Sequence, residues 1–136
     1  MKVLLVHEYY RSTNPSGEDR AFEAEKKLLK RYGVTVQAFT FKNDLIGTEF
    51  GPSVFKTALF TPWSPIGKKW IEKTILRFRP DVVHFHNTFP LLSQSVVIKA
   101  KMMGSATVQT LHNFRKLRPQ ATLLRDDKIC IECIDK

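Results

Sequence analysis

The sequence predicts an α/β protein with an open, mostly parallel, Rossmann-like sheet and helices on both faces. Short runs rich in leucine and β-branched residues alternate with longer segments of helical periodicity, in the order strand, helix, strand, helix, strand, helix, strand. The 136 residues have an ordinary globular composition, with 43% apolar and 26% charged residues, and no linker or repeat divides them. We therefore expect residues 1–136 to form a single domain.

The first three elements follow one another within the first forty residues or so. Residues 2–7, KVLLVH, indicate a buried strand followed by a loop rich in Ser, Asn, Pro and Gly. Residues 18–32 place apolar side chains at helical spacing and Lys and Glu elsewhere, which predicts an amphipathic helix ended by Gly33. Residues 34–41, VTVQAFTF, return to strand composition. This order implies a parallel strand pair joined by a right-handed crossover.

The rest of the chain repeats the alternation after an interruption. Glycines and prolines break residues 42–65, so we expect only short helical turns and loops there. Two further helices are expected at residues 66–79 and 91–104, and two further strands at residues 81–86 and 106–112. From Asn113 onward the chain is expected to form a basic loop with a short hairpin.

Charge favours anionic partners without choosing among them. The chain has 22 Lys and Arg against 13 Asp and Glu, a net charge of +9. No recognised nucleic-acid-binding motif is visible, so we expect no nucleic-acid partner. No apolar stretch approaches the roughly 18 residues of a membrane span, and the first ten residues do not form a signal peptide. We therefore expect a cytoplasmic protein, and we consider in addition a peripheral contact with the inner face of the membrane.

That addition concerns one basic stripe on the helix expected at residues 66–79. The stripe consists of Lys68, Lys69, Lys73 and Arg77. Nearby aromatic residues would allow it to lie on an anionic membrane surface. The other interpretation is an ordinary solvated helix face.

Three of the four predicted strands end in histidine, at His7, His86 and His112. Ligands of open parallel sheets bind beyond the carboxyl ends of the strands, so these side chains should converge on one rim. His84 and His86 share a face of their strand because side chains alternate with period two. We expect His84 to lie between sheet and helix as a structural residue, and His86 to lie at the mouth of the site.

A metal site is the alternative for this histidine pair. Two imidazoles could ligate zinc, but a third ligand is needed, and His7, Glu8 and His112 are the candidates in the sequence. Cys130 and Cys133 supply only two thiols, which cannot complete a tetrahedral site alone, so we treat them as structural. The sequence therefore predicts no metal.

The loop before the first helix is a second candidate site. Gly17 would let backbone approach a ligand, and the helix N-terminus that follows would attract a phosphate. The other interpretation is a simple turn with Ser16 as the helix cap. The three-glycine dinucleotide fingerprint is absent, which argues against an NAD-binding domain. Arg115 could reach the rim and bind an anion.

Three parts of the chain resemble the N-terminal domain of the retaining GT-B glycosyltransferases of family 4, also called group 1. They are MKVLLVHEYY with SGEDRAFEAEKKLLKRYG, then RPDVVHFHNTFPLLSQSV, then VQTLHNFR with LLRDDKICIEC. The resemblance implies an acceptor-side domain that faces a donor-binding domain outside this chain. It also implies metal-independent transfer from a nucleotide-sugar donor to a glycan or lipid-linked acceptor, with no cofactor because the nucleotide-sugar is a substrate.

By position, the resemblance implies a contact of Gly17 with the donor diphosphate, a place for His86 beside the reacting sugar, and places for His112 and Asn113 in the same cleft. Together with the rim and loop residues, this gives a predicted site of three groups: catalytic His86 and His112; acceptor contacts His7, Glu8, Asn87, Asn113 and Arg115; and donor-phosphate contacts Ser16, Gly17 and Glu18. The sequence departs from the family at Ser16-Gly17, where Gly-Gly is common, and at Arg118-Pro119, where Cys-Pro is common. The alternative function is a stand-alone module that binds a nucleotide or phosphorylated metabolite without catalysis.

Overall fold

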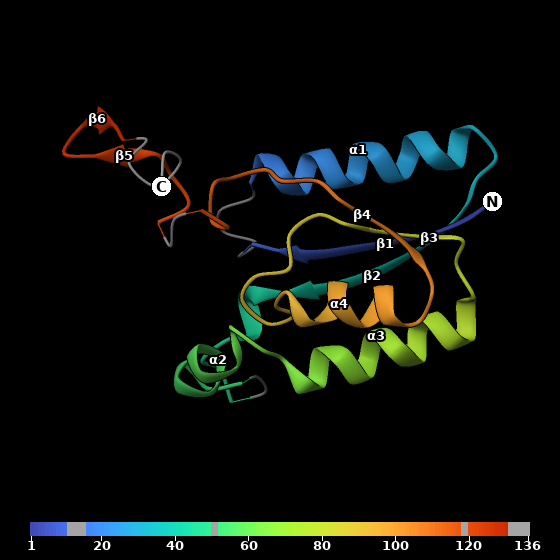
Figure 1. Ribbon diagram of the computed structural model, residues 1–136, viewed down its shortest axis with the longest axis horizontal. Helices are drawn as coiled ribbons and strands as arrows, with labels where there is room; N and C mark the ends of the chain where they lie inside the picture. The colour runs from blue at the N-terminus through green and yellow to red at the C-terminus, as the bar shows by residue number, and fades with distance from the viewer. Residues whose placement is uncertain (11–15, 50–51, 118–119, 131–136) are drawn as a thin grey trace.

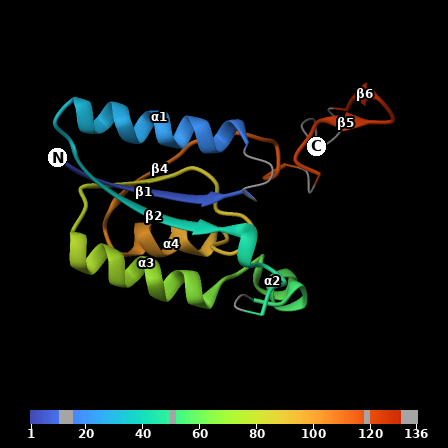
Figure 2. The same ribbon diagram turned by 180° about the vertical axis from the view of Figure 1, so that it is seen from behind.

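The computed structural model describes residues 1–136 except 11–15, 50–51, 118–119 and 131–136. Four parallel strands form a sheet that lies between two helical layers (Figure 1). Helix α1, Gly17–Arg31, covers one face, and α3, Pro65–Phe78, with α4, Ser95–Met102, covers the other (Figure 2). The predicted α/β class with helices on both faces of a parallel sheet is confirmed.

The strand order creates a site-forming edge. The strands are β1, Lys2–Tyr9, β2, Thr35–Lys42, β3, Val82–Phe85, and β4, Ala106–Gln109. They lie in the order β2-β1-β3-β4, with every neighbouring pair parallel. The chain continues from β1 to β2 on one side and then returns to form β3 on the other side of β1, so the order in which strands are added reverses between β1 and β3. Ligands of open α/β sheets bind beyond the strand ends at such a point.

Alternation along β1 divides the core into two parts. Leu4 and Val6 are buried toward α3 and α4 in one cluster, while Val3 and Leu5 are buried with Phe22 of α1 in the other. His7 continues the second set and Glu8 the first, because neighbouring side chains point to opposite faces. The two polar residues at the end of β1 therefore enter different layers.

Helix α1 begins and ends at local signals. The Ser16 side chain accepts the N–H of Asp19, and the Asp19 side chain accepts the N–H of Ser16, a reciprocal capping box. Gly33 follows the helix with φ of 74°, a left-handed conformation that glycine adopts without strain. The prediction for residues 18–32 is therefore close to the observed bounds.

Several boundaries differ from the sequence-based expectation. Between β2 and α3 the described residues contain, as predicted, short helices and loops: η1, Asn43–Leu45, and α2, Val54–Phe60. Helix α4 begins four residues later than expected because turns occupy the preceding segment. Strand β4 ends at Gln109, so His112 lies in the loop beyond it rather than at the strand end.

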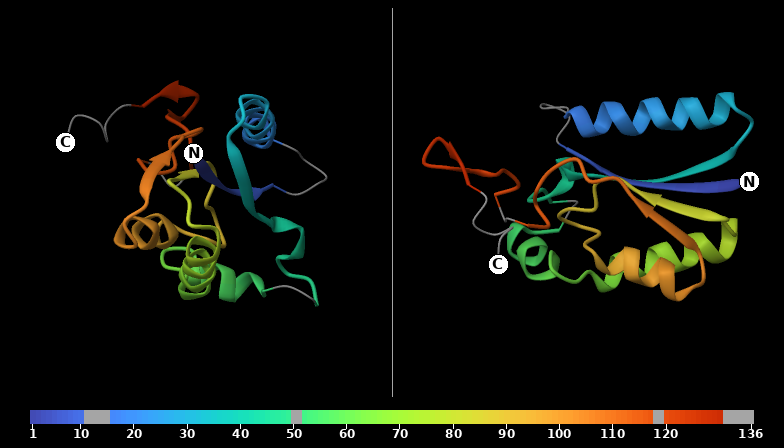
Figure 3. Two further views of the ribbon diagram at one scale, coloured as in Figure 1. Left: turned by 90° about the vertical axis from the view of Figure 1, so that its right-hand side faces the viewer. Right: turned by 45° about the horizontal axis from the view of Figure 1, so that its top comes forward.

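A hairpin and a short helix extend beyond the sheet. The hairpin expected after Asn113 is present as β5, Leu124–Arg125, antiparallel to β6, Lys128–Ile129. It lies with α2 at the end of the molecule where the sheet strands terminate (Figure 3). Among the described residues, no helix is long and apolar enough to cross a membrane.

Gly67 marks the close crossing of α3 over the start of α4, and we expect its replacement by alanine to destabilise the fold. A Cβ atom there would lie 3.0 Å from the Leu92 carbonyl oxygen and 3.1 Å from Val96 Cγ1. Overpacking should outweigh the helix-propensity gain and lower the free energy of unfolding by about 1–2 kcal/mol. Gly17→Ala is the matched control, since its Cβ would meet nothing within 4 Å. Equal urea midpoints for the two variants would contradict the prediction.

Candidate functional site

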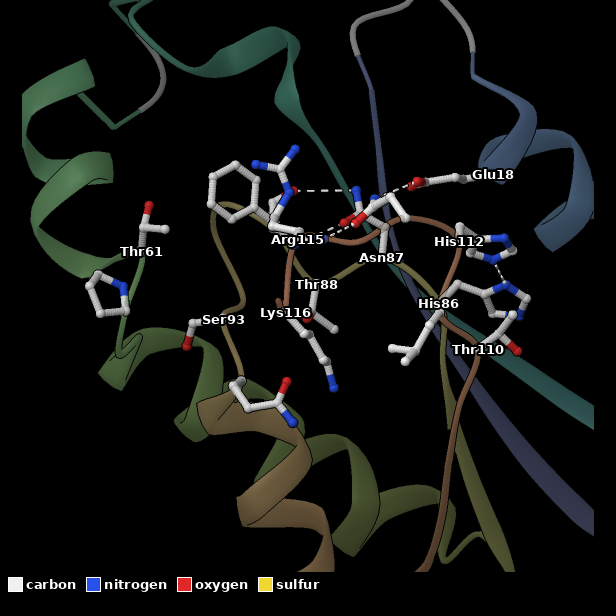
Figure 4. Close-up of a pocket in the computed structure, with 15 residues that line it drawn as sticks. Glu18, Thr61, His86, Asn87, Thr88, Ser93, Thr110, His112, Arg115 and Lys116 are labelled. Carbon is white, nitrogen blue, oxygen red and sulfur yellow. Dashed lines mark hydrogen bonds between the residues drawn. The ribbon is translucent and has the colours of Figure 1, made fainter. Parts of the chain in front are cut away.

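A cavity of about 240 Å³, lined mainly by polar and charged residues, lies beyond the carboxyl ends of β3 and β4 (Figure 4). Thr61 and Ser93 lie across it from His86 and His112, with Lys116 between them. Six of the ten residues assigned to the site from the sequence line this cavity: Glu18, His86, Asn87, His112, Asn113 and Arg115. The structure therefore brings together segments that are far apart in the chain.

His86 and His112 form a stacked pair at one side of the cavity. His86 Nδ1 lies 3.1 Å from His112 Nε2, and the ring centroids are 5.3 Å apart with planes 19° from parallel. The His86 side chain is only 1% exposed, whereas His112 is exposed. The expectation that His86 lies at the mouth needs correction: His86 forms the buried wall, and His112 forms the opening.

The buried histidine is held in its neutral form. Burial, together with the smaller effect of three neighbouring histidines, lowers the pKa of His86 to about 3. A neutral imidazole has one N–H donor and one acceptor nitrogen. His86 can therefore fix the tautomer and ring orientation of His112 through their shared hydrogen bond.

His84 occupies the layer between the sheet and α1, as expected. Its Nε2 lies 2.8 Å from Thr110 Oγ1, and its Nδ1 lies 2.6 Å from Glu25 Oε1. Its side chain is 13% exposed, more than that of His86, so the order of burial expected for the two is reversed. Glu25 was missed from the sequence, although it follows Phe22 by three residues on the sheet-facing stripe of α1.

His7 lies behind the cavity and does not line it. The ring is fully buried, stacks on Phe22 at 4.6 Å, and places Nε2 2.8 Å from Asp19 Oδ1. Its Nδ1 accepts the backbone N–H of Asn87 at 3.4 Å. Burial lowers the pKa of His7 despite the Asp19 carboxylate. These contacts tie α1 to the ends of β1 and β3, so they support a positioning role, and acceptor contact stays a prediction.

Glu8 faces the opposite layer and also lies outside the cavity lining. Its carboxylate is fully buried and accepts the backbone N–H groups of Leu91 and Leu92, each at 2.8 Å. Burial raises the pKa of Glu8 to about 7, although the two N–H donors act in the opposite direction. Glu8 thus fixes the loop between β3 and α4. Direct acceptor contact stays a prediction.

This raised pKa predicts a pH-dependent stability difference between the wild type and Glu8→Gln. The folded state holds the Glu8 proton more tightly than the unfolded state, so this contribution is fully present below about pH 4.5 and lost as pH rises to about 7. The wild type should lose roughly 3 kcal/mol relative to Glu8→Gln over that range. Urea unfolding of both proteins from pH 4 to 8 measures the difference. The pH-dependent contribution of His86, which has the opposite sign, is common to both proteins and drops out of the difference. Parallel stability curves would contradict the prediction.

Two asparagines shape the loops that border the cavity. Asn87 Nδ2 donates to the Glu8 carbonyl at 3.0 Å, and its Oδ1 accepts the N–H of Phe89 at 3.1 Å. Asn113 Nδ2 donates to Glu18 Oε1 at 2.8 Å, and its Oδ1 accepts the N–H of Arg115 at 3.0 Å. Both side chains therefore hold backbone in place while they line the cavity.

The cavity contains cationic side chains from the loop after β4. The Arg115 guanidinium lies 4.0 Å over the Phe89 ring, and Lys116 also lines the cavity. Lys116 is exposed, and its Nζ donates a hydrogen bond to Gln109 Oε1. Partial desolvation lowers the pKa of Lys116. Nothing local in the sequence distinguishes Lys116 from the other basic residues of its segment, so only the structure places it at the cavity. These two cations make the cavity suited to an anionic ligand.

The start of α1 fits the simple-cap interpretation better than a phosphate loop. Ser16 is occupied by its capping box, and Gly17 is the first helical residue, with ordinary φ and open space around it. Glu18 lines the cavity, and its Oε2 is buried without a hydrogen-bond partner among the described residues. Two carboxylates in the first turn oppose phosphate binding there. The donor-phosphate assignment stays a prediction.

The basic stripe of α3 is on the surface. Lys69, Lys73 and Arg77 are exposed, and Lys68 is half-buried with its Nζ 5.0 Å over the Trp63 ring. An apolar cavity that includes Phe60, Ile66 and Trp70 among its lining lies beside it. This arrangement is compatible with either interpretation of the stripe, and membrane contact stays a prediction.

The remaining predicted residues lie near the C-terminus. Cys130 is a half-buried free thiol, whereas Cys133 lies outside the described residues, so the structural role assigned to the pair is not addressed. Arg118 and Pro119, which mark a departure from the family pattern, also lie outside them.

Comparisons with protein families, curated proteins and solved structures found no match to this chain. Its function is therefore inferred from the chemistry of the cavity and from the sequence segments quoted above.

Proposed function

We propose that this chain is the acceptor-side domain of a retaining glycosyltransferase that uses a nucleotide-sugar donor in glycan synthesis, without a metal. One observation carries the proposal: the polar cavity at the carboxyl ends of β3 and β4, with the His86–His112 pair at its side. Its position beyond the carboxyl ends of the strands, beside the reversal of strand order between β1 and β3, is where open α/β folds bind ligands. The family resemblance gives that cavity a reaction class.

The lining suits a sugar or glycan hydroxyl. Hydroxyl groups are both donors and acceptors, and the cavity offers imidazole, amide and hydroxyl side chains with both capacities. Phe89 adds an aromatic surface, over which Arg115 lies. A wall of this kind can orient an acceptor while a second domain holds the donor opposite to it.

The histidine pair provides the central polar contact. When His86 Nδ1 donates to His112 Nε2, His112 has its proton on Nδ1 and can donate it to a hydroxyl or a developing negative charge. Arg115 and Lys116 would stabilise negative charge as the nucleoside diphosphate leaves. The bond to the anomeric carbon is broken and formed between the nucleotide-sugar and the acceptor hydroxyl, and the protein residues orient these groups and stabilise charge.

The test is a transfer assay with the protein encoded by the full reading frame. We expect that frame to encode a second α/β domain with two glutamates eight residues apart, and the protein to transfer labelled sugar from a nucleotide-sugar to an acceptor. The 136-residue chain alone should show little turnover, because one wall does not position both substrates. A reading frame without a donor-binding domain, together with no transfer from any of a panel of nucleotide-sugars, would overturn the proposal.

A second candidate is a binding module for a nucleotide or phosphorylated metabolite. The observation that favours it is the presence of Arg115 and Lys116 in the cavity lining. Calorimetry of UDP- and GDP-sugars on the 136-residue chain distinguishes the two candidates. Tight binding that is lost in Arg115→Ala/Lys116→Ala supports the module, whereas absence of binding agrees with a donor site in another domain.

A further inference from the structure

The face of β3 beneath α1 combines two imidazoles with a carboxylate from the helix. Glu25 Oε1 lies 2.6 Å from His84 Nδ1, and Glu25 Oε2 lies 3.2 Å from His86 Nε2. One ligand atom from each residue can be chosen so that all three lie within 4.8 Å of one another. We propose that Glu25, His84 and His86 form a Zn²⁺ site that joins α1 to β3. The proposed ion is structural and takes no part in sugar transfer, so this proposal neither depends on nor contradicts the metal-independent glycosyltransferase assignment.

An unpartnered buried nitrogen points to this ligand. His86 Nε2 is buried and makes no hydrogen bond among the described residues, although Glu25 Oε2 is 3.2 Å away. The two atoms are close but lack hydrogen-bond geometry. A buried polar atom without a partner destabilises the fold, and coordination to a cation would remove that cost.

The outer nitrogens of both histidines already have partners. His84 Nε2 lies 2.8 Å from Thr110 Oγ1, and His86 Nδ1 lies 3.1 Å from His112 Nε2. Metal-binding histidines almost always use their second ring nitrogen in this way, because the outer hydrogen bond fixes the tautomer and the ring orientation. His84 Nδ1 and His86 Nε2 are therefore the nitrogens left for a metal.

The ligand set selects the class of cation. Two imidazoles and a carboxylate suit Zn²⁺ and related transition metals rather than Mg²⁺ or Ca²⁺, which prefer oxygen ligands. Zinc would replace the proton between Glu25 and His84. Tetrahedral ligands at about 2.0–2.1 Å from zinc lie about 3.4 Å from one another. Zinc binding therefore requires the flexible Glu25 side chain to move, so that its ligand oxygen lies farther than 2.6 Å from His84 Nδ1 and still reaches the ion.

The site retains access to solvent. The Glu25 side chain is 29% exposed and that of His84 is 13% exposed, which leaves a route for the cation and for a water ligand at a fourth position. Both histidines lie in or directly after a strand, and the carboxylate lies in a helix, so the backbone positions are fixed before metal binds.

The test is titration of Zn²⁺ into the untagged chain, followed by calorimetry. Cys130→Ser/Cys133→Ser serves as the background, because two thiols near the C-terminus could bind zinc themselves. We expect one equivalent to bind, with affinity reduced at least about 100-fold in Glu25→Gln and in His84→Gln. Glu72→Gln removes a carboxylate that bonds Lys99 on the opposite face of the sheet, and should change affinity less than about twofold.

A second measurement identifies the ligand atoms even if a variant folds poorly. Nitrogen-15 spectra of the histidine rings in the background protein should show zinc-dependent shifts at His84 Nδ1 and His86 Nε2. Absence of binding at millimolar Zn²⁺ would overturn the proposal. So would binding that Glu25→Gln leaves unchanged, or primary shifts at His7 or His112 instead.

Discussion

Phe22→Ala is expected to lower the free energy of unfolding by about 3–5 kcal/mol, because it opens a cavity under the histidine layer. Phe22 is fully buried and joins Val3 and Leu5 in the core between α1 and the sheet. It also stacks on His7 and packs edge-on against His86, with centroids 4.6 and 5.4 Å away. Few residues connect the core to the site so directly.

Leu28→Ala is the matched control for this prediction. It removes a leucine from the same helix, but Leu28 is 53% exposed and should cost less than about 1 kcal/mol. Urea unfolding at constant pH measures both variants, and Phe22→Leu should fall between them. A Phe22→Ala midpoint equal to that of Leu28→Ala would show that the packing beneath the histidines contributes little.

Under the proposed transferase function, His112→Ala is expected to lower turnover of the full-length protein by about 10²–10³-fold, the usual cost of removing one donor to a developing charge. His112 is the exposed member of the histidine pair, whereas His86 is nearly fully buried. The loss should appear in kcat more than in KM, because the contact strengthens as charge develops. His86→Ala should also lower turnover, through loss of the hydrogen bond that orients His112.

Conservative variants identify the atom responsible. His112 Nε2 contacts His86, so Nδ1 is the nitrogen left to meet a substrate. Asparagine has an amide near the Nδ1 position and glutamine near the Nε2 position, so His112→Asn should recover more turnover than His112→Gln. His84→Ala should reduce stability more than turnover, because His84 does not line the cavity. Near-normal turnover in His112→Ala would remove it from the mechanism.

The sequence by itself determined the elements and their class, because period-two alternation and helical spacing are local properties of the chain. Residues 2–7 and 18–32 could be recognised as a strand and a helix without knowledge of any partner. The convergence of three histidines was also predictable, since parallel strands end at one edge. The His7 and His86 rings lie 6.1 Å apart, and His86 and His112 lie 5.3 Å apart.

Only the tertiary structure decided which of these groups lines the cavity and which is buried behind it. His86 is buried and His112 exposed because α1 covers the end of β3, while the loop after β4 folds over the cavity. That loop is held by the bond from Asn113 to Glu18, across 95 residues of sequence. Alternation assigns a side chain to a face of the sheet, but the elements that cover that face come from distant parts of the chain.

Glu25 illustrates the same division. Its place on the apolar stripe of α1, three residues after Phe22, was visible in the sequence, whereas its two histidine partners lie on β3 and directly after it. Helical periodicity reveals that a carboxylate faces inward, but not what it faces. The packing of α1 over β3 supplies that information. A carboxylate that is partly removed from water is stable only beside polar groups, and the two histidines are the polar groups that lie beneath Glu25.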